Sequence, residues 1–259
     1  MTQIIGFAGS KQSGKNTACN FILAIKIAEL GISKSSRLNK FGEIEITDIF
    51  NDRISNKDWF PFKEPYVEVN TLFNNELGKF IKLYSFADKL KRLCIDVLGL
   101  KEELVFGTDK QKNTKTHIKW NSISNPNHYD GTDTQGYMTV REVLQFVGTD
   151  MFRGLDASVW VSSCLRQIEE DQSEIALISD VRFENEVRAI QKQKGFVIGL
   201  TRTPNTQEAD THISEQEPKK CLSLCDIVID NKQLSMPEQN KAIYFAIKHL
   251  DNITDIVGD

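Results

Sequence analysis

Short, continuous apolar runs alternate with amphipathic stretches along most of this chain. The runs predict buried strands, and the stretches between them predict helices. The expected strands lie at about residues 3–9, 79–86, 174–180, 195–201 and 226–229, and the expected helices at about 15–30, 87–98, 139–147, 156–169, 184–193 and 235–250. Strands that are apolar on both faces and alternate with helices are typical of a parallel sheet covered on both sides. We therefore expect an α/β fold with three layers around a mostly parallel central sheet.

Two of the expected helix starts carry a capping box. Thr139 precedes Glu142 by three residues, and Ser235 precedes Glu238 at the same spacing. In a capping box the hydroxyl accepts a hydrogen bond from the backbone N–H of the glutamate, and the carboxylate accepts one from the first residue. The pattern predicts that helices begin at these two positions.

Length and pattern favour a single domain, residues 1–259, with two segments that break the alternation of strands and helices. Residues 41–78 hold a candidate strand at 42–49 and a turn-rich part with two prolines, which disfavour helix. We interpret this segment as an insertion or cover element. Residues 107–137 are polar and lack clear periodicity. Since long irregular loops in compact proteins are often functional, we interpret them as a lid or substrate loop.

Charge and cysteine usage narrow the classes of partner. A formal net charge of −4 and a pI near 5.7 argue against a protein that holds nucleic acid through clustered Lys and Arg. The five cysteines are scattered except Cys221 and Cys225, so neither a zinc site nor a disulfide framework is expected. No apolar run reaches the roughly 18 residues of a membrane span, and no basic leader precedes the first strand. We expect a cytoplasmic protein without nucleic-acid or membrane partners.

The most informative motif joins the first expected strand to the first expected helix. It consists of Gly9, Ser10, Lys11, Gln12, Ser13, Gly14, Lys15, Asn16 and Thr17. Its glycines allow backbone N–H groups to curl around a phosphate, and the helix N-terminus directs its positive dipole end there. Lys15 can then reach the β and γ phosphates of a nucleotide. The alternative is a glycine turn before a surface lysine, but the flanking strand and helix favour an ATP-phosphate loop and a P-loop NTPase-type fold.

The loop departs from the common pattern at one position. The residue after the lysine is usually Ser or Thr, whose hydroxyl binds Mg²⁺, but here it is Asn16, and the hydroxyl arrives at Thr17. A direct hydroxyl ligand to Mg²⁺ is therefore not assured by the motif. We expect the metal near Asn16, Thr17 or Asp180.

Asp180 and Arg182 form a second candidate at the carboxyl end of an expected central strand, where open α/β sheets bind ligands. A carboxylate there can orient Mg²⁺, and an arginine can neutralise charge on a transferring phosphoryl group. The alternative is that Asp180 caps the following helix and that Arg182 pairs with Glu186, four residues on. The phosphate loop is expected at the same sheet edge, which favours Lys15, Asp180 and Arg182 as the catalytic residues.

Three further side chains are ambiguous from pattern alone. Arg141 and Gln145 are four residues apart and share a helix face, which suits a nucleotide phosphate or base edge but equally a solvated surface. Trp160 lies in a mostly apolar helix, where a tryptophan is more often part of the core than a stacking platform.

Taken together, four segments are similar to the deoxynucleoside monophosphate kinases encoded by large tailed phages, a branch of the P-loop nucleoside monophosphate kinase group. They are residues 9–17, 139–150, 180–186 and 210–215. The order and spacing of four motifs is more specific than any one of them. The resemblance spans about residues 3–230 and leaves 41–78 and 107–137 unmatched.

The resemblance implies that the γ-phosphoryl group of ATP passes to a deoxynucleoside 5′-monophosphate, with Mg²⁺ as cofactor. It also implies that Asn16 is a family trait, that family members form homodimers, and that a phage protein of this kind works in the host cytoplasm. The implied contacts to substrate or transition state are Arg141, Gln145, Trp160, Asp180, Arg182 and Glu186.

Two other functions are compatible with the loop. One is a P-loop kinase for another small acceptor, such as dephospho-coenzyme A, and an ADP assay with a panel of acceptors would separate the two. The other is a regulatory module that binds ATP without transferring phosphate, which would have no need for Asp180 and Arg182 opposite the loop.

Overall fold

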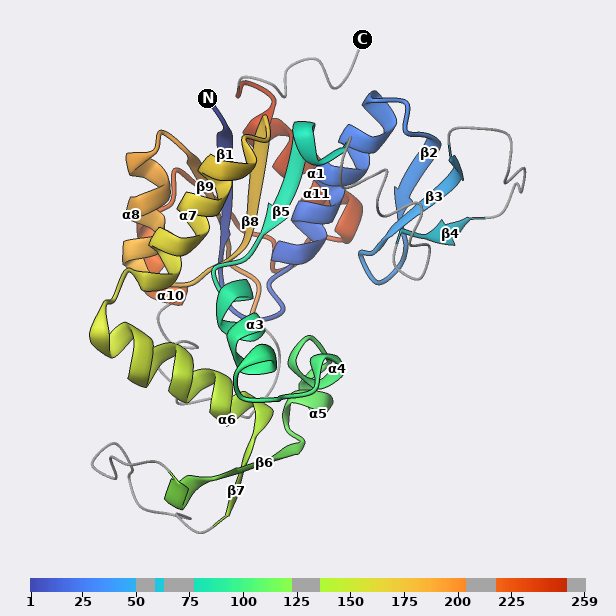
Figure 1. The fold of residues 1–259 in the computed structure, drawn as a ribbon. Coiled ribbons are helices and arrows are strands. Elements are labelled where there is room, and N and C mark those ends of the chain that lie inside the picture. Colours follow the sequence, from blue (N-terminus) through green and yellow to red (C-terminus); the bar gives the residue numbers. More distant parts are fainter. Residues whose placement is uncertain (50–58, 63–76, 123–135, 204–217, 251–259) are drawn as a thin grey trace. The chain divides into compact units, whose positions relative to one another are not determined.

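The computed structural model describes residues 1–49, 59–62, 77–122, 136–203 and 218–250 (Figure 1). The chain divides into two compact units. The first consists of residues 1–85 and 166–259, and the second of residues 86–165. Each unit is described below by itself.

A five-stranded sheet forms the centre of the first unit (Figure 1). Its strands are β1 (Gln3–Ala8), β5 (Ile81–Tyr84), β8 (Ile175–Val181), β9 (Phe196–Leu200) and β10 (Ile227–Ile229). They lie in the order β10-β9-β1-β8-β5, and every neighbouring pair is parallel. The expected α/β fold with a parallel central sheet is confirmed, and all five expected strands are present. The motif-bearing strand β1 lies in the middle, as the position of a buried apolar run predicts.

Helices cover the sheet on both faces. On one face, α1 (Lys15–Glu29) and α11 (Met236–Ile247) pack on the strands, and Ile22 and Ile243 join Phe7 and Leu177 in one core cluster. Burial of each such side chain contributes roughly 1.5–3 kcal/mol. On the other face, α8 (Glu184–Lys192) lies so close to β1 that a Cβ on Gly6 would come within 2.7 Å of Ile190. The backbone of β1 is therefore fixed from both sides.

A small antiparallel sheet follows α1. It contains β2 (Ser33–Leu38), β3 (Ile44–Ile49) and β4 (Phe60–Pro61), in that order. Ile44 and Ile46 of β3 are buried in the core cluster of the first unit. The expected strand at 42–49 is confirmed. Much of the 41–78 segment, residues 50–58 and 63–76, lies outside the described residues.

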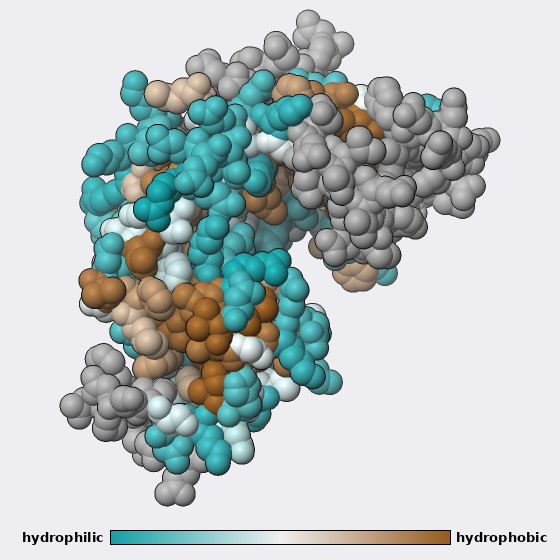
Figure 2. All heavy atoms as spheres, in the orientation of Figure 1, coloured by the Kyte–Doolittle hydropathy of each residue, from teal (hydrophilic) through white to brown (hydrophobic). Residues whose placement is uncertain are grey.

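The second unit is mainly helical. Its elements are α3 (Asp88–Asp96), α4 (Glu102–Val105), α5 (Asp109–Lys112), β6 (Lys115–Lys119), η1 (Trp120–Ser122), β7 (Tyr137–Thr139), α6 (Val140–Gln145), the π-helix η3 (Phe146–Arg153) and the first half of α7 (Val159–Asp171). Both capping boxes form, at α6 here and at α11 in the first unit. Hydrophobic residues gather on the visible face of the second unit around α6 and η3 (Figure 2).

The proposed lid, residues 107–137, contributes α5, β6 and the start of β7, and residues 123–135 lie outside the described part. Its role as a lid stays a prediction. The first unit is completed by α10 (Pro218–Cys221) and η4 (Leu222–Leu224). In the parts of the chain that the structure describes, no helix is long and apolar enough to cross a membrane.

Candidate active site

The loop between β1 and α1 depends on glycine at two positions. Gly9 has φ +145°, and a Cβ there would lie 2.5 Å from the carbonyl oxygen of Leu200. Gly14 has φ +99° and is the N-cap of α1, where a Cβ would lie 2.6 Å from Gln239. A larger residue would have to adopt an unfavourable backbone conformation and would also collide with its neighbours. The sequence therefore specifies a tight turn that ends at the positive end of α1.

The ammonium group of Lys15 is held by the loop itself. Its Nζ donates hydrogen bonds to the carbonyl oxygens of Gly9 at 2.8 Å and Ser10 at 2.6 Å, and to Ser13 Oγ at 3.4 Å. Only 7% of the residue is exposed. A lysine this buried is rare unless its charge is well solvated by polar partners, and here three oxygens of the loop supply them. The positive charge is thus fixed within the turn.

The carboxyl end of β8 brings Asp180 to the same edge of the sheet. Ala8, the residue before Gly9, pairs with Val181, so Asp180 lies beside the start of the loop. Ser85 follows β5, the other neighbour of β8, and its Oγ donates a hydrogen bond of 2.6 Å to Asp180 Oδ2. The carboxylate is therefore oriented by the end of the adjacent strand.

The pKa of the Cys19 thiol depends on its burial and on two nearby charged residues. Burial raises the pKa of Cys19 well above its usual range, the negative charge of Asp180 adds to the rise, and the positive charge of Lys15 opposes it. Both charged groups therefore lie near one buried thiol, in the second turn of α1.

Arg182 lies in the turn between β8 and α8, and its backbone is tightly held. Glu186 Oε2 accepts hydrogen bonds from the backbone N–H of Arg182 at 2.7 Å and of Phe183 at 3.0 Å. Cys221 Sγ donates to the carbonyl oxygen of Arg182 at 3.0 Å. Through these two bonds Glu186, which is 1% exposed, caps the start of α8. This position suits a residue that orients Arg182, and direct contact between Glu186 and substrate stays a prediction.

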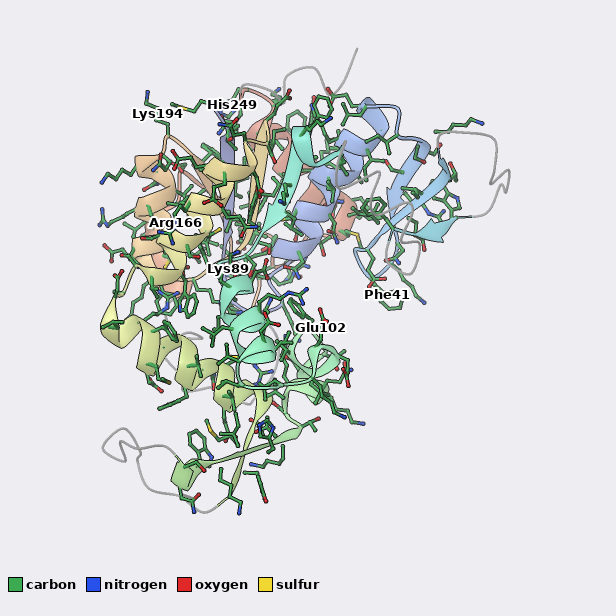
Figure 3. All side chains as sticks on the ribbon, in the orientation of Figure 1. Phe41, Lys89, Glu102, Arg166, Lys194 and His249 are labelled. Carbon is green, nitrogen blue, oxygen red and sulfur yellow. The ribbon has the colours of Figure 1, made fainter. Side chains whose placement is uncertain are left out.

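The turn between β2 and β3 packs on the first turns of α1. Asn20 Nδ2 donates a hydrogen bond of 2.8 Å to the carbonyl oxygen of Gly42, and a Cβ on Gly42 would collide with Thr17 Oγ1. Phe41, which precedes Gly42 in this turn, is labelled in Figure 3 and is 72% exposed. The hydroxyl of Thr17 therefore has a packing neighbour in the hairpin, whereas Asn16 is exposed.

Comparisons with known proteins identify the family of this chain. The family model described as "Deoxynucleotide monophosphate kinase" matches residues 3–239. The chain belongs to the deoxynucleotide monophosphate kinase family. A protein of Acanthamoeba polyphaga mimivirus named "Putative deoxynucleotide monophosphate kinase" is 30% identical over 165 residues, which cover 58% of this chain and 75% of that protein. Members of this family are phosphotransferases with a phosphate group as acceptor, and ATP and a deoxynucleoside monophosphate are the substrates that the family implies.

The remaining expected substrate residues of this kinase lie in its second unit. Arg141 Nη2 forms an ion pair of 2.6 Å with Asp109, and its Nε donates to Asn113 at 3.0 Å. Gln145 is half-buried at the end of α6. Trp160 is 6% exposed, and its Nε1 donates to the carbonyl oxygen of Gly148 at 2.9 Å. This burial favours the core interpretation of Trp160 over the stacking one.

The expected site residues thus fall into two groups. Lys15, Asp180, Arg182 and Glu186 belong to the first unit, with the loop, and Arg141, Gln145 and Trp160 belong to the second. Of the four motifs that carry the resemblance, residues 9–17 and 180–186 belong to the first unit and residues 139–150 to the second. The fourth motif, residues 210–215, lies outside the described residues. Pattern analysis missed two polar residues that contact the loop. They are Asn231 and Gln239.

The residues near the loop suit a magnesium ion that is held mainly by phosphates. Mg²⁺ in kinases is usually bound by one or two carboxylates together with substrate phosphates and water. Asp180 supplies one carboxylate at the sheet edge, and Asn16 supplies an exposed carboxamide. Within the described ranges, no three His, Cys, Asp or Glu side chains come together as a metal cluster. This donor set fits an ion that arrives with its nucleotide.

Proposed function

We propose that this kinase transfers the γ-phosphoryl group of ATP to the phosphate of a deoxynucleoside monophosphate, giving ADP and the diphosphate. The single observation that carries the proposal is the buried ammonium of Lys15, which the loop carbonyls of Gly9 and Ser10 hold at the start of α1. A fixed cation and a helix N-terminus together favour a polyphosphate. Residues 9–17 form the proposed ATP-phosphate site.

In this proposal Lys15 and Arg182 stabilise the negative charge of the phosphate groups. Phosphoryl transfer needs alignment and charge stabilisation more than covalent chemistry from the protein. Lys15 Nζ would exchange part of its bonding to the loop for the β and γ phosphate oxygens. Arg182 lies in a turn, and Glu186 and Cys221 hold the backbone of this turn in place. This supports a role for Arg182 in stabilising the phosphoryl group during transfer.

Asp180, Asn16 and Thr17 are the proposed metal contacts, with Asp180 the strongest of the three. A bound Mg²⁺ would neutralise charge on the β and γ oxygens. The hydrogen bond from Ser85 keeps one carboxylate oxygen of Asp180 oriented at the sheet edge. Thr17 is the weakest of the three because its hydroxyl packs against Gly42.

Arg141, Gln145, Asp180, Arg182 and Glu186 remain the proposed contacts to the monophosphate. Trp160 is the weakest member of the proposed set, because its burial favours a place in the core. Arg141 is the best supported in the second unit, because a guanidinium offers a fork of donors that suits phosphate oxygens. In the structure it pairs with the carboxylate of Asp109. A homodimer, a phage origin and a location in the host cytoplasm are further proposals, which rest on the resemblance to phage kinases alone.

An acceptor panel tests the function. Purified protein is incubated with ATP and Mg²⁺ and each common nucleoside monophosphate in its ribo and deoxy form, with dephospho-coenzyme A as a further acceptor, and ADP release is followed. We expect ADP only with monophosphates and higher kcat/KM for at least one deoxy form than for its ribo counterpart. The proposal would be contradicted if dephospho-coenzyme A were the one acceptor that gives ADP. It would also be contradicted if none of the acceptors in the panel gave ADP.

A further inference from the structure

Asn231 lies directly behind the phosphate loop and follows the last strand, β10. It is fully buried, at 0% exposure. Its Nδ2 donates to the carbonyl oxygen of Ser13 at 2.8 Å and to Gln239 Oε1 at 2.6 Å, and its Oδ1 accepts from the backbone N–H of Arg202 at 2.8 Å. The orientation of the carboxamide is determined by its neighbours, since a carbonyl oxygen can only accept and a backbone N–H can only donate. Both Nδ2 hydrogens are used.

Two neighbours fix Asn231 in this position. The guanidinium of Arg202 donates to the carbonyl oxygen of Asn231 at 3.1 and 2.9 Å and to that of Leu234 at 2.5 Å, which holds the turn after β10. Gln239, on α11 and 1% exposed, accepts from Asn231 and donates at 3.4 Å to the carbonyl oxygen of Gly14. A network in which every member is bonded is rigid, because breaking one bond leaves a buried polar group without a partner.

Because the peptide bond is planar, holding the Ser13 carbonyl also fixes the direction of the Gly14 N–H. The carbonyl of Ser13 and the N–H of Gly14 belong to one planar trans peptide, so they point in opposite directions. The Asn231 amide holds the carbonyl from behind, which fixes the direction of the Gly14 N–H on the other side. At Gly14 the next carbonyl is already directed by α1, because it accepts from Ala18 N at 2.9 Å. The Ser13–Gly14 peptide is therefore the unit whose orientation depends on Asn231.

We propose that Asn231, supported by Gln239, is a positioning residue that aims the Gly14 N–H at a nucleotide phosphate. The inference rests on the proposed function, in which the loop binds ATP phosphates. A donor that is already aimed needs no reorganisation when the charge arrives, which is the basis of electrostatic preorganisation. Asn231 acts through the loop backbone and contacts no substrate itself.

The variant Asn231→Ala tests this role against a matched control, Gln191→Ala. In the control, Gln191 Nε2 also donates to a backbone carbonyl at 2.8 Å, that of Leu224, but this bond lies outside the loop. The affinities for inorganic tripolyphosphate and for ATP are measured by calorimetry, together with the KM values for ATP and for the monophosphate. We expect Asn231→Ala to weaken tripolyphosphate binding by about tenfold and to raise the KM for ATP but not that for the monophosphate, with little change in the control.

The outcomes separate this inference from the proposed function. If the wild-type protein binds neither tripolyphosphate nor ATP, the proposed function fails and the inference fails with it. If the wild type binds both and Asn231→Ala binds them equally well, only the inference is overturned. Equal rises in both KM values would also overturn it, since a general loss of structure would affect both substrates.

A second variant covers the case in which Asn231→Ala does not fold. Gln239→Met keeps Asn231 and most of the buried volume but removes one of the two acceptors of the Asn231 Nδ2 group. A cooperative thermal transition with a smaller, selective loss of tripolyphosphate affinity is the expected result. Loss of folding in both variants, with the Gln191 control intact, would overturn the proposal, because the network would then serve the fold rather than the loop.

Discussion

Ser85 Oγ donates a hydrogen bond of 2.6 Å to Asp180 Oδ2 and so joins the ends of two neighbouring strands, β5 and β8. The bond places a hydroxyl and a carboxylate from residues far apart in sequence at one edge of the sheet. Asp180 is also close enough to Cys19 to raise the pKa of that thiol, beyond the larger effect of burial. Asp180 thus contacts the residue that follows β5 and lies near the helix that follows the loop, α1.

Removal of the Ser85 hydroxyl is expected to disturb Asp180 without removing its charge. Ser85→Ala should lower kcat about tenfold, the usual effect of losing a hydrogen bond to a charged group. It should also raise the Mg²⁺ concentration for half-maximal activity. The measurement is a Mg²⁺ titration of the steady-state rate. Tyr84→Phe is the control, because it removes another hydroxyl that donates to a carboxylate, that of Asp171, at 2.9 Å. Equal Mg²⁺ profiles for Ser85→Ala and the control would contradict the proposed role of Asp180.

Arg141 is expected to contribute to acceptor binding through its fork of donors. Arg141→Lys keeps the charge but loses the bidentate geometry, so the KM for the monophosphate should rise about tenfold while the KM for ATP stays unchanged. Arg92→Lys is a matched control in the same unit, where Arg92 pairs with Glu102 at 2.7 Å. Arg141 has no role in substrate binding if both variants keep the wild-type KM for the monophosphate.

The turn between β2 and β3 should tolerate no side chain at Gly42. Gly42 has φ +75°, and an added Cβ would meet Thr17. Gly42→Ala should therefore lower the free energy of unfolding by more than about 1 kcal/mol in a urea titration. Gly154→Ala is the control, since a Cβ at Gly154 meets nothing within 4 Å. A Gly42→Ala protein as stable as this control would show that the hairpin does not pack closely on α1.

Stability should decrease in alkaline solution through Cys94. Burial raises the pKa of the Cys94 thiol from 9.0 to about 11 in the folded protein. The unfolded chain loses this proton above about pH 9, whereas the folded protein keeps it to about pH 11, so the contribution to stability is lost as pH rises through that window. Urea unfolding from pH 8 to pH 11 should show a smaller decline for Cys94→Ala than for the wild type. Parallel curves would contradict the raised pKa.

Local signals were enough to predict the central sheet and the loop. The apolar run of β1, the glycines of the loop and the start of α1 are contiguous in sequence. Each of them is recognised from its own residues, without reference to distant parts of the chain. The capping boxes at Thr139 and Ser235 were predicted for the same reason, since all their partners lie within three residues.

Features that depend on distant partners were not predicted. β2 was not predicted, because Ser35 and Ser36 give no apolar alternation. Its pairing with β3 supplies the missing stabilisation. Asn231 contacts Ser13 across 218 positions of sequence, and a single carboxamide has no spacing that marks it. Such contacts are specified by the tertiary fold rather than by any short window of residues.

Transfer of label from ATP tests the central claim most directly. Wild-type protein, Lys15→Ala and the control Lys192→Ala, which changes an exposed lysine at the end of α8, are each incubated with Mg²⁺, ATP labelled in its γ phosphate and a deoxynucleoside monophosphate. Circular dichroism and thermal unfolding confirm that each variant is folded. The account predicts labelled deoxynucleoside diphosphate from the wild type and the control, and a rate lower by orders of magnitude from Lys15→Ala. Wild-type rates from folded Lys15→Ala, or label released only as inorganic phosphate by the wild type, would contradict it.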